Sequence, residues 1–84
     1  MTNDAEIIFY HTTWCPDCVR AKRFLVKHNI ACRWINVSRD ADGLAYVKEV
    51  NNGMRVVPTI VFPDGEILTE PSNAELAEKL GIGK

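Results

Sequence analysis

The chain has 84 residues, of which 46% are hydrophobic and 25% are charged, and its formal net charge at pH 7 is -1. This length predicts a single domain covering residues 1–84 rather than two separate cores. The near-neutral charge argues against nucleic acid and an anionic membrane surface as partners, and we expect a monomer.

The cysteine content and the N-terminal sequence suggest a compartment. Three cysteines are too few, and odd in number, for the disulfide framework of a small secreted protein. Residues 1–6 lack the basic flank and apolar stretch of a signal peptide, and no segment is long enough to cross a bilayer. We therefore expect a cytoplasmic protein, in which thiols are kept reduced.

The first half of the chain predicts a strand–helix–strand unit. Residues 6–10 are an apolar and aromatic run typical of a strand buried on both faces. Pro16 suits the first turn of a helix, which continues at helical spacing to about His28. Asn29 ends this helix, and residues 32–37 are predicted to be a second strand. A crossover unit of this kind places its two strands parallel.

The second half predicts a helix, a hairpin and a last helix. Ser38 or Asp40 can cap the first of these, and residues 56–62 and 66–69 form two apolar runs separated by a Pro-Asp-Gly turn. Residues 71–73 offer a cap for the last helix, which a glycine closes. The order is β-α-β-α-β-β-α, which predicts an α/β fold.

Two cysteines, Cys15 and Cys18, flank the start of the first predicted helix. Disulfide exchange needs a thiolate as the attacking species, and the free N–H groups at a helix N-terminus stabilise that anion at Cys15. Cys18 follows one helical turn later and can resolve a mixed disulfide formed at Cys15. Asp17 lies between them, and its charge opposes the thiolate if it lies close to Cys15. The pair predicts a nucleophile at Cys15 and a resolving thiol at Cys18.

Metal binding is the alternative reading of a C-x-x-C pair. A zinc site needs four ligands, and Cys32, His11 and His28 could complete a set only if folding brought them together, so we expect no metal site. An iron–sulfur cluster shared between two subunits through Cys15 is a further alternative. We expect Cys32, within the second predicted strand, to be a small buried apolar residue.

The dipeptide Val57-Pro58 is the second informative feature. A proline entering a strand lacks the N–H that the sheet ladder uses, so its presence there needs a special reason. A cis peptide bond is one such reason, and a trans proline that starts the strand is the other. The dipeptide alone does not separate them.

Three elements in order carry a resemblance: Trp14-Cys15-Pro16-Asp17-Cys18 after a strand, Arg55-Val56-Val57-Pro58-Thr59 before a hairpin, and Asp64-Gly65 within it. Together they resemble the glutaredoxin family. Residues 64–72 look like the mycoredoxin branch of that family, which reduces mixed disulfides of mycothiol. The resemblance implies a single-domain thioredoxin/glutaredoxin fold with a four-stranded mixed sheet and flanking helices.

The resemblance also implies an activity and a binding site. The activity is that of a thiol–disulfide oxidoreductase, with no tightly bound cofactor and with mycothiol or glutathione as co-substrate; its partners would be this low-molecular-weight thiol and disulfide-containing proteins. Pro58 would be cis beside Cys15, and the backbone of Val57 would pair with the incoming thiol compound. The other substrate-binding residues would be Trp14, Arg55, Thr69, Glu70 and Ser72. For Trp14, packing in the core is the alternative.

Two departures from the family pattern bear on the thiol. Thr12 stands where many glutaredoxins have a lysine, and Thr69-Glu70-Pro71 replaces their Gly-Gly stretch. Both disfavour glutathione and favour a mycothiol-type thiol. Two other functions stay open at this point: a thioredoxin-like hydrogen donor reduced directly by a flavoprotein reductase, and a metal or iron–sulfur carrier.

Overall fold

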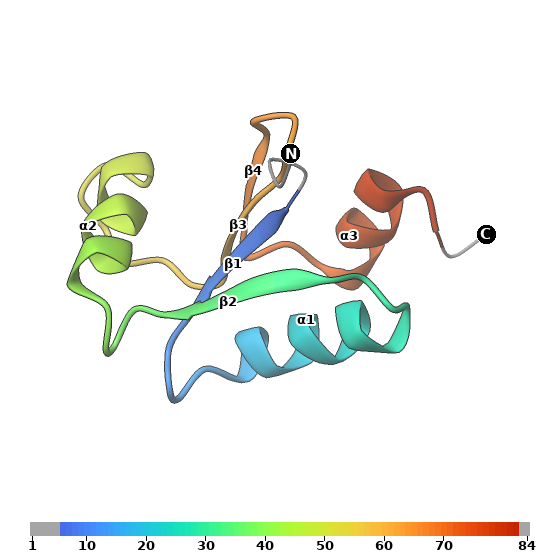
Figure 1. The fold of residues 1–84 in the computed structure, drawn as a ribbon, viewed down its shortest axis with the longest axis horizontal. Coiled ribbons are helices and arrows are strands. Elements are labelled where there is room, and N and C mark those ends of the chain that lie inside the picture. The colour runs from blue at the N-terminus through green and yellow to red at the C-terminus, as the bar shows by residue number, and fades with distance from the viewer. Residues whose placement is uncertain (1–5, 83–84) are drawn as a thin grey trace.

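The computed structural model describes residues 6–82, which form a four-stranded sheet and three helices (Figure 1). The strands are β1 (Ile7–His11), β2 (Cys32–Asn36), β3 (Thr59–Val61) and β4 (Ile67–Thr69), and the helices are α1 (Pro16–Lys27), α2 (Ala41–Val50) and α3 (Asn73–Leu80). Within this part of the chain, no helix has the length and apolar character needed to span a bilayer.

The sheet is mixed and has the strand order β2-β1-β3-β4. β1 and β2 are parallel, whereas β1 pairs antiparallel with β3, and β3 pairs antiparallel with β4. This arrangement confirms the predicted α/β fold, its element order and the parallel crossover unit. It also places the end of β1, and hence the cysteine pair that follows, at the middle of the sheet (Figure 1).

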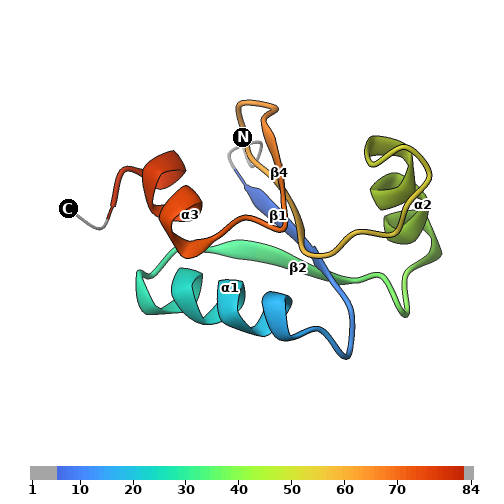
Figure 2. The same ribbon diagram turned by 180° about the vertical axis from the view of Figure 1, so that it is seen from behind.

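Helices cover both faces of the sheet, as the two opposite views show (Figures 1 and 2). Phe9 of β1 packs with Leu25 of α1 and Leu76 of α3 in one core cluster, and all three are fully buried. Tyr10, the next residue, faces the other way and packs with Val47 of α2. Because successive side chains of a strand point to opposite faces, a strand covered on both sides reads as a continuous apolar run.

The ends of the helices follow their capping residues. Asp40, not Ser38, caps α2, and its carboxylate accepts a hydrogen bond from the N–H of Gly43 at 2.8 Å. Ser72 and Glu75 form a reciprocal capping box at the start of α3. Gly81 closes α3 in the left-handed conformation, with φ of 71°, which glycine adopts without steric cost.

Two predictions about the strands were wrong in detail. The strand expected at residues 56–62 is only Thr59–Val61, because Pro58 has no N–H to donate and ladder pairing starts after it. Cys32, expected to be a buried mid-strand residue, is half-buried at the first position of β2. Because β2 lies at the edge of the sheet, its side chains are covered less completely than those of β1.

Asn51, just after α2, ties this helix to β3 and β4. Its side-chain N–H groups donate to the carbonyl of Val47 at 2.8 Å and to the hydroxyl of Thr59 at 3.2 Å, and its oxygen accepts from the hydroxyl of Thr69 at 3.1 Å. The buried Thr59 hydroxyl in turn donates to the carbonyl of Val56 at 2.7 Å. This network holds the segment that carries Val57 and Pro58 against the sheet.

Replacing Thr59 by Val should therefore destabilise the fold, because the carbonyl of Val56 and the amide of Asn51 each lose a partner in a buried place. We expect the free energy of unfolding, measured by urea denaturation of the reduced protein, to fall by about 1–3 kcal/mol. Thr69→Val removes an exposed hydroxyl bonded to the same asparagine and should change it by less than about 0.5 kcal/mol. Equal effects of the two variants would contradict this account.

Candidate active site

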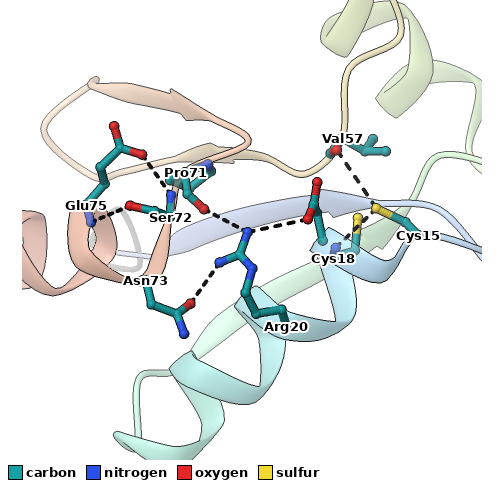
Figure 3. A network of polar contacts seen from close by, with 9 residues as sticks. Cys15, Cys18, Arg20, Val57, Pro71, Ser72, Asn73 and Glu75 are labelled. Carbon is teal, nitrogen blue, oxygen red and sulfur yellow. Dashed lines mark hydrogen bonds and ion pairs between the residues drawn. The ribbon is translucent and has the colours of Figure 1, made fainter.

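Cys15 is the N-cap of α1, and its sulfur lies where the helix begins (Figure 3). Its backbone is extended, with φ of -156° and ψ of 102°, and Pro16 occupies the first helical position. The Cys15 Sγ accepts a hydrogen bond from the N–H of Cys18 at 3.1 Å. A hydrogen bond of this kind, together with the positive end of the helix dipole, favours a negative charge on the sulfur.

The two cysteines differ in their access to solvent. Both are free thiols in this structure; Cys15 is half-buried, whereas Cys18 is only 4% exposed. Burial raises the pKa of the Cys18 thiol to about 12, and its hydrogen bond with Cys15 acts in the same direction. Cys18 is therefore protonated at neutral pH, and Cys15 is the one of the pair whose sulfur an incoming disulfide can reach. This asymmetry supports the assignment of Cys15 as nucleophile and Cys18 as resolving thiol.

The Val57–Pro58 segment lies against Cys15. The peptide bond is cis, as the family resemblance implied. The Cys15 thiol points to the carbonyl oxygen of Val57, 3.9 Å away, although the two residues are 42 positions apart in the chain (Figure 3). The carbonyl of the next residue, Pro58, accepts a hydrogen bond from the N–H of Glu70 at 2.8 Å. These contacts link the Cys15 sulfur to the Val57–Pro58 segment, and that segment to the backbone of Glu70.

Arg20 joins α1 to the start of α3. Its guanidinium donates to the carbonyl of Pro71 at 3.0 Å and to the side-chain oxygen of Asn73 at 2.8 Å, and it lies 3.8 Å from the carboxylate of Asp17 (Figure 3). The charge of Asp17 therefore faces a guanidinium rather than standing alone. The sequence did not single out Arg20, because nothing local indicates a contact with a residue 51 positions away.

The remaining predicted site residues are on the surface. The side chain of Trp14 is 88% exposed, so packing in the core, one of the two expectations for it, is wrong. Arg55, Thr69 and Glu70 are also exposed. Glu70 has a positive φ of 51°, and its backbone rather than its carboxylate makes the contact with Pro58.

Ser72, by contrast, uses its backbone N–H and its hydroxyl to cap the start of α3. Its N–H donates to the carboxylate of Glu75 at 2.7 Å, and its hydroxyl accepts from the N–H of Glu75 at 3.1 Å (Figure 3). The sequence predicted a cap in residues 71–73 but not this capping box. The pattern Ser-x-x-Glu before an apolar helix was present and would have indicated it.

The alternative ligands for a metal lie apart. Among residues 6–82, no three side chains of the His, Cys, Asp or Glu type are grouped so that they could hold an ion. Cys32 is on the edge strand, where its thiol donates to the carbonyl of Ile30 at 3.9 Å. Burial raises the pKa of Cys32 to about 11, so this thiol too is protonated at neutral pH.

Comparison with known proteins agrees with this geometry. The Glutaredoxin family model matches residues 7–68. The chain is 38% identical over 76 residues to the glutaredoxin candidate Rv3198A of Mycobacterium tuberculosis, with 90% of each chain covered. It is 36% identical over 78 residues to Mycoredoxin 1 of Corynebacterium glutamicum, covering 90% of this chain and 94% of the relative.

The fold has solved relatives as well. A point variant of the thioredoxin-like protein BC3987 superposes with a TM-score of 0.82 at 29% identity, covering 93% of this chain and 97% of that chain. The similarity therefore spans the helix-capping cysteine pair, the segment around Pro58 and the sheet that positions them. The chain belongs to the glutaredoxin family and is a thiol–disulfide oxidoreductase.

Proposed function

We propose that the protein reduces mixed disulfides of a low-molecular-weight thiol through Cys15. The observation that carries this is the capping position of Cys15, where a reachable sulfur accepts the N–H of Cys18. The Cys15 thiolate attacks the sulfur of the small thiol in the mixed disulfide, and the substrate sulfur leaves with the electron pair. A second molecule of the small thiol then attacks the small-thiol sulfur bound to Cys15, which forms the symmetrical small-thiol disulfide and releases Cys15 as a thiolate.

A second route would serve protein disulfides. After a protein sulfur is bound to Cys15, Cys18 attacks Cys15, closes the Cys15–Cys18 disulfide and releases the reduced protein. The short spacing supports this route, because the backbone N–H of Cys18 already contacts the sulfur of Cys15. We propose that both routes operate in the cytoplasm, where small thiols are abundant and protein thiols are kept reduced.

For the small thiol we favour mycothiol. One ground is the 36% identity with Mycoredoxin 1 over an alignment that covers 94% of that relative. The other is that Thr12 and the Thr69-Glu70-Pro71 stretch depart from the pattern of many glutaredoxins. The groove that would hold the thiol is proposed to run past Val57, Pro58 and the backbone of Glu70. Trp14, Arg55, Thr69 and Ser72 are proposed to line it.

Cys18→Ser should separate the two routes. We expect the variant to keep most of the reduction of a small mixed disulfide, because that route uses only Cys15, and to lose turnover of protein disulfides by at least about 100-fold. Cys15→Ser should abolish both. Coupled assays with a mixed-disulfide substrate and with a protein disulfide measure the two rates, and loss of both in Cys18→Ser would contradict the monothiol route.

Thiol preference can be measured directly. On one model substrate carrying mycothiol, glutathione or bacillithiol as the mixed-disulfide partner, we expect kcat/KM to be highest for mycothiol, by about tenfold or more. The same peptide should be used for all three, so that only the small thiol differs. A preference for glutathione would refute the assignment of the thiol and leave the chemistry of Cys15 unaffected.

Arg20 should matter for binding rather than for chemistry, because it holds the Pro71–Asn73 segment and does not touch the sulfur. Arg20→Gln should raise KM for the mixed disulfide by about tenfold with little change in kcat. Arg23→Gln, an exposed arginine on the same helix, is the matched control and should leave both constants unchanged. A fall in kcat alone in Arg20→Gln would place this residue in the chemical step.

A thioredoxin-like hydrogen donor is the second candidate, favoured by the similarity to the thioredoxin-like protein BC3987. In that case a flavoprotein reductase would reduce the Cys15–Cys18 disulfide directly. Oxidation of NADPH by such a reductase with this protein as acceptor, in the absence of any small thiol, would support this candidate over the first.

A further inference from the structure

A cavity beside the cysteine pair takes no part in the chemistry described above. Its volume is about 320 Å3, and it lies between the end of β1 and the first turns of α1. Cys18 lines it from α1, and His11 lines it from the last position of β1. Thr13 and Lys22, both exposed, also line it, so the cavity opens to solvent. Most of the lining is apolar, but His11, Thr13, Lys22 and Asn36 contribute polar groups, and a cavity of this size has room for water beside them.

The resolving step requires the Cys18 thiol to lose its proton, and this cavity can supply the acceptor. Cys18 must attack as a thiolate, but burial raises the pKa of its thiol, so only a small fraction of molecules carries that anion at neutral pH. Cys15 cannot take the proton while it is part of a mixed disulfide. A nearby acceptor that works at neutral pH would remove this barrier.

His11 has the properties of such an acceptor. Burial lowers the pKa of its imidazole, the positive charge of Lys22 lowers it further, and a hydrogen bond with the backbone of Thr12 opposes both. The lowered pKa favours the neutral ring, in which one nitrogen can accept a proton. Lys22 and Cys18 face it from α1, whereas the groups from β2 and the loop, Asn36 and Thr13, do not titrate.

We propose that His11 is the general base for the resolving thiol, acting through water in the cavity that it shares with Cys18. This rests on the proposed dithiol route. The Cys18 proton passes through water to the imidazole, and the Cys18 sulfur attacks Cys15. The Cys15–Cys18 bond forms, the bond from Cys15 to the substrate sulfur breaks, and that sulfur leaves as a thiolate. The imidazolium then returns the proton to the leaving thiolate or to solvent.

Stopped-flow reaction of the reduced protein with the aromatic disulfide DTNB tests this step. Attack by Cys15 releases one nitrothiobenzoate, and resolution by Cys18 releases a second, so the two steps appear as separate phases. Nitrothiobenzoate released by the reaction of Cys32 with DTNB is measured separately in Cys15→Ser. The second phase should be absent from Cys18→Ser. If the parent protein gives no second phase, the dithiol route itself fails, which is a result distinct from failure of the role of His11.

The pH profile of the second phase is the decisive readout. With a neutral imidazole as base, its rate should be flat from about pH 9 down to about pH 6.5 and fall only below the lowered pKa of His11. In His11→Gln the rate at pH 7 should drop by about 100-fold or more and rise tenfold with each pH unit, as expected for hydroxide. The first phase should be unchanged, because Cys15 is not among the residues that line the cavity.

Two further variants sharpen the test. Lys22→Gln removes a positive charge that lowers the pKa of His11. The pH below which the second-phase rate falls should therefore rise, while the rate above that pH stays the same. His28→Gln changes the only other histidine, which caps the far end of α1, and should alter neither phase. A parent profile that is first order in hydroxide throughout, or an unaltered second phase in His11→Gln, would overturn the proposal. The pH profile of the parent protein tests the proposal even if one of the variants fails to fold.

Discussion

The hydrogen bond from the N–H of Cys18 to the sulfur of Cys15 is the constraint on which the rest of the site depends. It makes the Cys15 sulfur part of the helix cap, so the same contact that starts α1 also fixes the position of the sulfur and favours its anion. The sulfur of the proposed nucleophile is therefore positioned by the start of the helix. Since α1 packs through Ala21 and Leu25 into the main core, sulfur and core are positioned together.

Other segments reach this sulfur through the backbone rather than through side chains. Val57 presents its carbonyl to Cys15, and the neighbouring carbonyl of Pro58 accepts from Glu70. Arg20 then fastens the following turn to α1 through the carbonyl of Pro71. Backbone groups do not depend on the identity of the residue that carries them. The surroundings of the sulfur can thus stay fixed while the exposed side chains of the same segments change.

The sequence predicted those features that local physics decides. The run at β1, the proline after Cys15 and a cap at Ser38 or Asp40 each act within a few residues, and the structure confirms the first two and selects Asp40. Features set by distant contacts were missed. The partners of Arg20 are about 50 positions away, the cavity shared by His11 and Cys18 exists only after folding, and the half-burial of Cys32 follows from the edge position of β2.

The exposure of Trp14 has a practical consequence. The chain has two indoles: Trp34 packs against Phe9 with the ammonium of Lys22 above its ring, while Trp14 stands in water one residue before the reactive sulfur. In the proposed groove, a compound bound at Cys15 would cover Trp14 and leave the surroundings of Trp34 unchanged. Intrinsic fluorescence of the unlabelled protein therefore carries a signal for occupancy of the site and, in the second indole, an internal reference.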